Sequence, residues 1–363
     1  MLGNPEQTPG TTGSGPALSN SSPLEGVSAP KQEFQLAGFA PGRPPSEGVA
    51  REIADLFVRV YGTVHNRPFL LDPKILIAKV ENGDLYPFVA RNSDGLMVAH
   101  TAVVNLGEGV FEIDFQLADP AYRGKKVGSV LRDLALNRIE ALHHDGIANV
   151  FRADCVTSHG ITQKYGDQIK MQVTGIFDRK YPDFFTPGRD ESVVRIERIL
   201  TEPIKNERTV YVPSTLRAIA EHIYTVHGCQ RTVNVTPSDA AVEATPRIDS
   251  DTHERQAFET TSLTVTPGVS AAEISAEAAA QFRDGAKHLS VRVDITHPAS
   301  IYQINVLRGL GFYFASLEMK ANRDYMQFQK LRDLSGPCCP GEVNIYSPDA
   351  RKLLELIRES QTS

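Results

Sequence analysis

A short basic turn carries the clearest chemistry in this sequence of 363 residues. It reads Arg-Gly-Lys-Lys-Val-Gly over residues 123–128, between a segment that alternates apolar and polar residues and a segment with helical spacing. A helix N-terminus has unpaired N–H groups and a dipole that favours negative charge, and glycine lets a phosphate approach the main chain. The turn therefore predicts a pyrophosphate site. The residues expected to bind it are Arg123, Gly124, Lys125, Lys126, Val127, Gly128 and Ser129.

This turn resembles motif A of the GNAT superfamily, R/Q-x-x-G-x-G/A, which binds the pyrophosphate of acyl-CoA. Arg123 matches the first position of the motif and Gly128 matches the last, whereas Lys126 replaces the middle glycine. Lysine at that position adds positive charge and requires no different backbone. Together with the order of the elements around it, the resemblance covers about residues 31–200.

The resemblance implies the GNAT fold, a mixed splayed sheet flanked by helices, with acyl-CoA in the opening between the fourth and fifth strands. It implies acetyl-CoA or another acyl-CoA as co-substrate. It also implies that a main-chain N–H near Leu117 and Ala118 polarises the acyl carbonyl, where negative charge develops during transfer. The expected activity is transfer of an acyl group, in the first place acetyl, to a primary amine by direct attack on the thioester.

Two carboxylates are the candidates for the base that this chemistry needs. Glu112 and Asp114 lie two residues apart on the alternating segment, so they point to one face of a strand. The resemblance implies a base on this strand in many members of the family. A carboxylate beside an apolar wall has a raised pKa and can accept a proton near neutrality. The alternative is that both residues are solvent-facing polar positions of the strand.

The candidate acids lie on the helix expected after the fifth strand, where many family members place a tyrosine. Tyr165 is the tyrosine available there, and its expected role is to protonate the departing thiolate. His159 is a second candidate, as acid or base, because its ordinary pKa lies near neutrality. His159 and Gln163 are four residues apart and would share one face of a helix. The alternative for His159 is a structural hydrogen bond at the start of that helix.

Hydrophobic periodicity predicts an α/β (α+β) fold for the first part of the chain. Strand patterns alternate with helical ones, and Asn-Ser-Asp-Gly at 92–95 predicts a hairpin turn. The expected strands are 33–39, 86–91, 96–104, 110–118, 149–155, 171–177 and 192–200, and the expected helices are 47–61, 127–144 and 158–166. Residues 180–189 are expected to form an excursion between the last two strands.

The rest of the chain repeats this order, which predicts two GNAT-like units in tandem. It lacks a basic glycine turn, so the second unit is a degenerate copy that is not expected to bind CoA. The domains expected are a disordered leader at 1–30, a GNAT domain at 31–201 and a GNAT-like domain with a C-terminal helix at 202–363. The expected elements of the second domain are strands at 258–265, 288–295, 312–318 and 325–331, helices at 214–226, 271–282, 299–310 and 348–359, and a long loop at 232–253.

Composition narrows the classes of function. The formal net charge of −6 gives no global basic field for nucleic acid or an anionic membrane, and neither partner is expected. The four cysteines lack the spacing of metal ligands, so we expect free thiols, a cytoplasmic protein and no metal. The acidity favours a cationic amine acceptor, either a small molecule or a protein lysine. A monomer and a homodimer both fit the sequence.

Two other functions remain open at this point. One is a CoA-binding regulatory or scaffold protein that has lost catalysis, since the base and the acid are less certain than the basic turn. The other is a different acyl-CoA reaction on the same fold, such as decarboxylation. The intact turn favours an enzyme over a scaffold.

Overall fold

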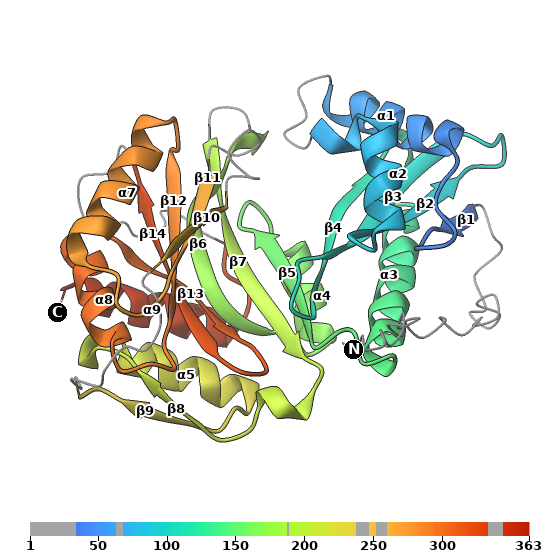
Figure 1. Ribbon diagram of the computed structural model, residues 1–363. Helices are drawn as coiled ribbons and strands as arrows, with labels where there is room; N and C mark the ends of the chain where they lie inside the picture. Colours follow the sequence, from blue (N-terminus) through green and yellow to red (C-terminus); the bar gives the residue numbers. More distant parts are fainter. Residues whose placement is uncertain are drawn as a thin grey trace, which may run out of the picture. The chain divides into compact units, whose positions relative to one another are not determined.

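The computed structural model describes residues 34–62, 68–186, 189–236, 247–251, 260–332 and 344–362. Within these residues, helices flank a mixed sheet of twelve strands (Figure 1). The α/β class and the mixed sheet flanked by helices, which the sequence predicted, are confirmed. The leader expected at 1–30 lies outside the described residues, as do Cys338 and Cys339.

The first part of the chain contains the elements that position the candidate site. They are β1 (Gln35–Gly38), α1 (Glu47–Tyr61), α2 (Pro73–Glu81), β2 (Leu85–Arg91), β3 (Met97–Asn105), β4 (Val110–Ala118), α3 (Val127–His144), β5 (Val150–Val156), α4 (Ile161–Gln168), β6 (Gln172–Thr186) and β7 (Arg189–Ile199). The bounds of α1, β4 and α3 are those predicted. The expected excursion at 180–189 is wrong, because β6 and β7 extend through its described residues.

Helix α2 was not predicted from the sequence, although its start signals are present. The Asp72 carboxylate caps the helix by accepting from the N–H groups of Lys74 and Ile75, and Pro73 occupies the first turn. The helix has only nine residues, and its buried apolar side chains are Leu76 and Val80. Such a short pattern gives a weak periodic signal.

The second part contains η3 (Glu202–Ile204), β8 (Arg208–Tyr211), α5 (Arg217–His227), β9 (Arg231–Asn234), β10 (Ile248–Asp251), β11 (Thr260–Val265), α7 (Ala271–Arg283), β12 (His288–Asp294), α8 (Ser300–Gly309), β13 (Tyr313–Met319), β14 (Asp324–Leu331) and α9 (Pro348–Thr362). The long loop expected at 232–253 is wrong where it is described, because β9 and β10 lie in it. Both are four-residue strands, too short for an alternating pattern to reveal.

The strand order of the large sheet is β1-β2-β3-β4-β5-β7-β6-β13-β14-β12-β11-β10. In the first part, helix α3 connects β4 to its parallel neighbour β5, and β7 and β6 come next in the sheet. In the second part, helix α7 connects β11 to its parallel neighbour β12, and β14 and β13 come next in the sheet. The second part therefore repeats the pairing of the first. The two series meet where β6 pairs with β13, with Gly175 opposite Ser316.

Strands β4 and β5 stay together for only a short distance. Their three pairs are Val110 with Val150, Phe111 with Phe151 and Glu112 with Arg152. Both strands continue beyond this point without further pairs between them, and they diverge in Figure 1. The sheet is thus splayed next to Glu112, as the sequence resemblance implied.

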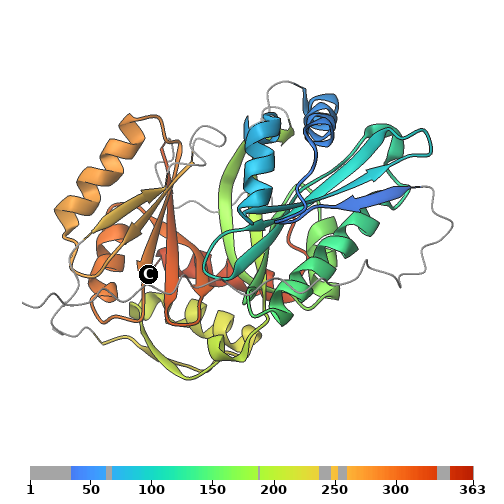
Figure 2. The same ribbon diagram turned by 45° about the vertical axis from the view of Figure 1, so that its right-hand side comes forward.

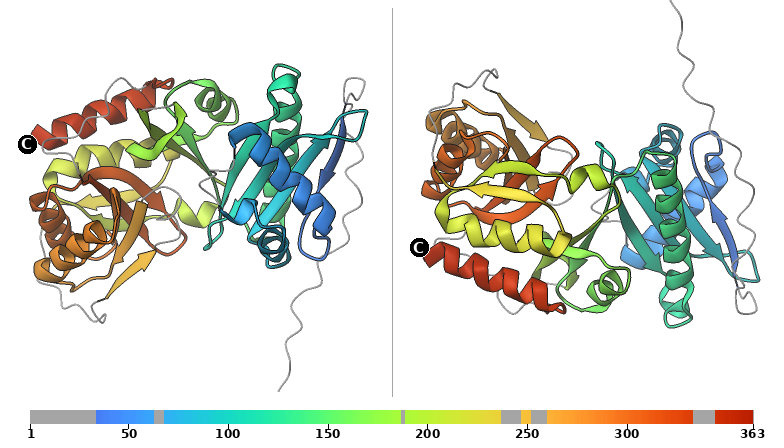
Figure 3. Two further views of the ribbon diagram at one scale, coloured as in Figure 1. Left: turned by 90° about the horizontal axis from the view of Figure 1, so that it is seen from above. Right: turned by 90° about the horizontal axis from the view of Figure 1, so that it is seen from below.

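Helices cover both faces of the first part of the sheet. Ala102 packs in one apolar cluster with α1 and α2, whereas its neighbour Val103 packs in another with α3. Neighbouring residues of a strand point to opposite faces, so α1 and α2 lie opposite α3. In the second part, α7 and α8 pack on the same face of β12 (Figure 2). Helix α9 lies beside α5 (Figure 3).

A buried ion pair network fastens the small β8–β9 sheet to β14. The fully buried Asp324 carboxylate contacts Arg231 at 2.6 Å and Arg208 at 2.8 Å, and it accepts a hydrogen bond from Tyr224 at 3.0 Å. The Arg231 side chain is fully buried and that of Arg208 is 18% exposed, and Asp324 is the only acidic partner of each among the described residues. Asp324 therefore links three segments that are far apart in the sequence.

We expect Asp324→Asn to lower the free energy of unfolding by about 3–5 kcal/mol, because it leaves two guanidinium groups without a counter-charge. Asp249→Asn is the control. It breaks the exposed pair with Arg247 and should cost at most about 1 kcal/mol. Urea unfolding measures both values. Similar losses in the two variants would show that the Asp324 network does not fasten β8 and β9.

Candidate functional site

The N-terminus of α3 is open to a ligand. Its N-cap residue is Lys126, and no side chain caps the helix. The first hydrogen bond of the helix runs from the N–H of Val130 to the carbonyl of Lys126. The N–H groups of Val127, Gly128 and Ser129 therefore precede the hydrogen-bonded part of the helix, where an anion is favoured.

The backbone of the turn explains how lysine can replace the glycine of the family motif. Lys126 has φ 63° and ψ 5°, which is the left-handed region that glycine adopts most readily. Holding a lysine there costs about 1–2 kcal/mol. Gly124 is also left-handed, with φ 79°. The turn therefore has the conformation of a glycine-rich anion loop, with one glycine exchanged for a cation.

The side chains of the turn leave space in front of the helix. A Cβ added to Gly128 would lie 3.8 Å from the Gln116 amide nitrogen and meet nothing closer. The same amide donates to the Gly128 carbonyl at 2.8 Å and so ties the turn to β4. Arg123, Lys125 and Lys126 are exposed, and the Lys125 ammonium lies 4.8 Å from the centre of the Tyr122 ring.

Two of the predicted CoA-binding residues contribute differently from the rest. The side chain of Val127 is buried in the core, so only its N–H can face a ligand. Ser129 is exposed on the first turn of α3. The predicted residues 123–129 therefore form a single turn at the start of α3, with three exposed basic side chains, whereas Leu117 and Ala118 lie on β4.

The corresponding helix of the second part is closed. Ser270 and Glu273 form a capping box at the start of α7, in which the Glu273 carboxylate accepts from the Ser270 N–H at 2.8 Å. A negative charge of the protein thus occupies the position where α3 is open and basic. This contrast supports the expectation that the second part binds no CoA.

The pairings of the sheet also identify the positions of the second part that correspond to the site. Counting outward from the Gly175–Ser316 pair, each strand of one part matches a strand of the other. Arg195 then corresponds to Gln327, Asp154 to Arg292 and Glu112 to Ser262. At these matched positions, therefore, only the first part has carboxylates that could serve as a base.

A β-bulge in β4 turns the backbone beside the open edge of the strand. The register with β3 shifts by one residue between His100 and Ala102, and Phe115 has φ 56°. The Phe115 carbonyl contacts the ring nitrogen Nδ1 of buried His100 at 2.9 Å. Burial lowers the pKa of His100 to about 4, so the ring is neutral and Nδ1 donates this hydrogen bond.

The hydrogen bond at the end of β4 indicates which main-chain N–H faces the opening. The Asp119 N–H donates to the Val98 carbonyl of β3 at 2.9 Å. Successive N–H groups of a strand point to opposite edges, so the N–H of Ala118 points away from β3, toward the side where β5 has separated. Of the two residues predicted to polarise the acyl carbonyl, Ala118 has the suitable direction and Leu117 does not.

Glu112 lies at the point where the strands part. It is partly buried, and one of its carboxylate oxygens accepts from the Asp154 N–H at 3.3 Å. Burial and the neighbouring charges of Asp154 and Asp114 raise the pKa of Glu112 to about 8. A carboxylate with such a pKa can take a proton from an ammonium group near neutral pH, as a base for amine chemistry must.

Asp114 follows Glu112 on the same face of β4 and acts electrostatically on Tyr61. Asp114 accepts from the Phe115 N–H at 2.7 Å and is partly buried. Burial and the charge of Asp114 raise the pKa of Tyr61, which is the last residue of α1, and the charge of Arg123 acts against them. Tyr61 was not among the residues predicted from the sequence. Nothing in the local pattern distinguishes it from the apolar face of its helix.

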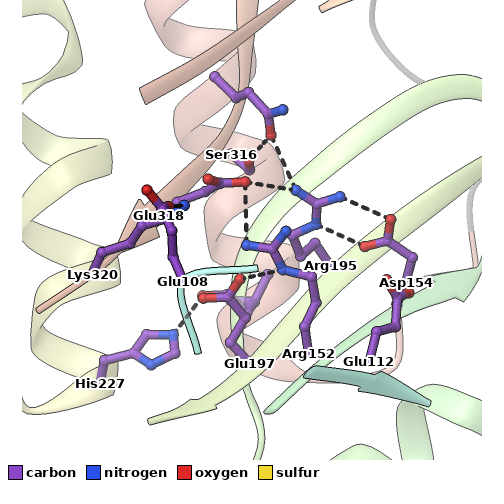
Figure 4. Close-up of polar contacts among 12 residues, drawn as sticks. Glu108, Glu112, Arg152, Asp154, Arg195, Glu197, His227, Ser316, Glu318 and Lys320 are labelled. Carbon is purple, nitrogen blue, oxygen red and sulfur yellow. Dashed lines mark hydrogen bonds and ion pairs between the residues drawn. The ribbon is translucent and has the colours of Figure 1, made fainter. Parts of the chain in front are cut away.

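A network of buried charges lies behind the carboxylates (Figure 4). Asp154 contacts Arg195 through two hydrogen bonds of 2.8 and 2.9 Å and Lys180 at 2.7 Å. Burial alone would raise the pKa of Asp154, but Arg195 and Lys180 outweigh it and hold that pKa well below its usual range. Asp154 is therefore a fixed negative charge beside Glu112. The sequence analysis did not predict it.

The expectation that His159 and Gln163 share a helix face is wrong, because His159 lies outside the helix. The helix α4 begins at Ile161, and His159 is exposed in the segment before it. Gln163 is buried and holds residues 344–346, because its side chain donates to the Asn344 carbonyl and accepts from the Tyr346 N–H.

Tyr165 packs against α3. The guanidinium of Arg132 lies 3.3 Å from the centre of its ring, and its hydroxyl is 3.5 Å from the Asp133 carboxylate. Burial raises the pKa of Tyr165, although the charge of Arg132 opposes the rise. The hydroxyl is therefore protonated at neutral pH, as a proton donor must be.

The remaining sequence expectations concern thiols, metals and membranes. Cys155 and Cys229 are free and buried, and burial raises the pKa of the Cys155 thiol well above its usual value. Cys155 packs in the core with α3, on the face opposite Asp154, so it is a structural thiol. No cluster suited to a metal ion is found among the described residues. None of the described helices is long and apolar enough to cross a membrane.

No family model and no curated protein matches the chain. Several solved structures resemble part of it. A GNAT-family acetyltransferase from Staphylococcus aureus Mu50 has 13% identity and a TM-score of 0.34, and the match covers 46% of this chain and 99% of that one. The putative acetyltransferase yncA from Salmonella typhimurium, solved with its cofactor acetyl-CoA, has 12% identity and a TM-score of 0.36, with 47% and 96% covered. A mutant form of the spermidine N-acetyltransferase SpeG from Vibrio cholerae has 12% identity and a TM-score of 0.37, with 46% and 94% covered.

These matches span about half of this chain, and at their low identity they carry nothing about its substrate. The chain's own topology is more informative. The strand order and the parting of β4 from β5 in residues 35–199 agree with the fold that the resemblance of the basic turn implied.

We expect Gly128→Leu to abolish binding of acetyl-CoA and of free CoA without unfolding the protein, because the added side chain would fill space that the protein leaves empty. Gly48→Leu is the matched control. Gly48 is also the second residue of a helix, and a Cβ there meets only the Ser46 hydroxyl at 3.8 Å. Isothermal calorimetry compares the two. Unchanged CoA affinity in Gly128→Leu would show that the turn is not the nucleotide site.

Proposed function

We propose that the chain is an acyl-CoA-dependent N-acyltransferase that transfers an acyl group, in the first place acetyl, to a primary amine. One observation carries the proposal. The uncapped, basic N-terminus of α3 opens beside the edge where β4 and β5 part, and Glu112 lies at the point of parting. The proposed anion site at the start of α3 would thereby adjoin β4, which carries the proposed main-chain donor and the proposed base.

The open turn would hold the pyrophosphate of the co-substrate. The N–H groups at the start of α3 donate to phosphate oxygens, and Arg123, Lys125 and Lys126 neutralise the charge. The acyl chain then extends along the open edge of β4. There the N–H of Ala118 donates to the acyl carbonyl oxygen and stabilises the charge that develops on it.

Glu112 would act as the base. An amine arrives at neutral pH as an ammonium ion and must lose a proton before its nitrogen can attack the thioester carbon. Glu112 can take that proton because burial and Asp154 raise its pKa. The C–N bond then forms, the C–S bond breaks, and the departing thiolate takes a proton from an acid, for which Tyr165 is the proposed residue. Asp114 is the second proposed base and His159 the second proposed acid.

The acceptor is proposed to be a cationic amine, either a small molecule or a protein lysine. A suitable panel contains a polyamine, an aminoglycoside, an amino acid derivative and a lysine peptide, each supplied with acetyl-CoA. Release of free thiol that depends on one of these amines would establish the activity. Binding of CoA without turnover of any of them would favour a regulatory or scaffold role. Release of CO₂ from malonyl-CoA would favour decarboxylation.

Turnover should rise with pH through about 8, because Glu112 acts as a base only after it loses its own proton and its pKa is raised. Glu112→Gln should lower kcat by about 10²–10⁴-fold and remove this rise, while acetyl-CoA binding persists. Asp114→Asn, two residues along the same strand, is the comparison. Loss of the pH dependence in Asp114→Asn alone would make Asp114 the base.

Tyr165→Phe should lower kcat by about 10²–10⁴-fold and leave the dissociation constant of acetyl-CoA nearly unchanged, because only the proton on the hydroxyl is removed. His159→Gln is expected to change kcat little, since His159 is exposed and precedes the helix. Steady-state kinetics and calorimetry on both variants separate the effects. A normal rate in Tyr165→Phe would remove this residue from the mechanism.

A further inference from the structure

One carboxylate of the second part of the chain reaches into the charged network of the first part. Glu318 lies on β13, and its side chain is only 5% exposed. It contacts Arg152 at 3.2 Å, Arg195 at 3.3 Å and Arg292 at 3.4 Å, as Figure 4 shows for the first two. Burial would raise the pKa of Glu318, but the three guanidinium groups outweigh it and keep the carboxyl ionised.

Arg152 is a cation on the strand next to the proposed base. It lies directly opposite Glu112 in the last pair between β4 and β5, so the two side chains share a face of the sheet. Yet its guanidinium turns the other way. It donates to Glu197 at 2.7 Å and contacts Glu318 at 3.2 Å. No ion pair of Glu112 is found among the residues that the structure describes.

Arg195 is held in the same manner. Two of its nitrogens bind Asp154, and the third contacts Glu318 at 3.3 Å and Gln327 at 3.1 Å. A planar guanidinium with partners on both sides has little freedom to turn toward another carboxylate. Glu318 therefore contacts both Arg152 and Arg195 and holds their guanidinium groups.

The charged groups that act on Glu112 come from four strands. They are Asp114 on β4, Asp154 on β5, Lys180 on β6 and Arg195 on β7. Lys180 and Arg195 both form ion pairs with Asp154, so that carboxylate neutralises much of their charge. Arg152 is paired instead with Glu197 on β7 and with Glu318 on β13. The direction of Arg152 thus depends on Glu197 and Glu318.

We propose that Glu318 is a positioning residue that holds Arg152 and Arg195 away from Glu112 and so leaves this carboxylate free to accept a proton. The inference rests on the proposed function for the role of Glu112, but the contacts that carry it are those of the protein alone. It gives the second part of the chain a task in the reaction, since β13 supplies a side chain on which the base of the first part depends.

The test is the titration of Glu112 in the purified full chain without any ligand. The infrared difference between wild type and Glu112→Gln isolates the carbonyl band of protonated Glu112. In Glu318→Gln we expect the midpoint of this band to move to lower pH by about one to two units, because a released guanidinium can pair with Glu112. The rise of turnover with pH should move in the same direction.

Two further variants keep the test decisive. Glu108→Gln removes another carboxylate of the network, which pairs with Lys320, and it should leave the Glu112 midpoint in place. Glu318→Asp keeps the charge on a shorter side chain and should give a shift between those of wild type and Glu318→Gln. It also replaces the glutamine variant if that variant does not fold.

The outcomes separate the two proposals. An unchanged Glu112 midpoint in both Glu318 variants, with acetyl-CoA still bound by wild type, overturns the positioning role alone. An equal shift in Glu108→Gln overturns it as well, because the effect would then be one of general charge. Failure of wild type to bind acetyl-CoA, with the Glu112 midpoint shifted as expected in Glu318→Gln, overturns the acyltransferase proposal and leaves the positioning role standing.

Discussion

The candidate site depends on the separation of β4 from β5 after three residue pairs. Two strands that stayed paired would use their N–H groups on each other and would leave no edge for a ligand. Because they part at Glu112, the edge of β4 is open, the helix α3 begins beside the opening, and a carboxylate lies at the fork. The bulge at Phe115 belongs to the same constraint, since it turns the backbone just before the residues that face the gap.

Much of this arrangement could be predicted from the sequence because it is local. The alternation of β4 and the helical spacing of α3 are continuous patterns, and the basic turn lies between them, so its place at a helix N-terminus follows. The left-handed conformation of Lys126 was not predicted from the sequence. The ends of α4 and the short helix α2 were missed because a few residues carry little periodic signal.

The charged network could not be predicted, because its members meet through strand register. Arg195 and Asp154 are 41 residues apart, and Glu318 is a further 123 residues from Arg195. Each lies on a strand whose pattern says only which face it uses. Burying so many charges is costly unless each has partners, and removing one partner is costly in turn. Such a cluster therefore fixes the identity of several residues at once, which a single sequence does not reveal.

The pairing of β6 with β13 has a consequence for the origin of the chain. The strands that meet are the corresponding strands of two like series, antiparallel to each other, and the residues at the meeting point are small. A Cβ on Gly175 would lie 2.2 Å from that of Ser316, so no residue larger than glycine fits at position 175. A local twofold axis between β6 and β13 would relate two equivalent strands that pair in this antiparallel way. Two identical subunits would pair about such an axis, and a duplicated gene that fused them would free one copy to lose its anion turn while it kept the shared strand.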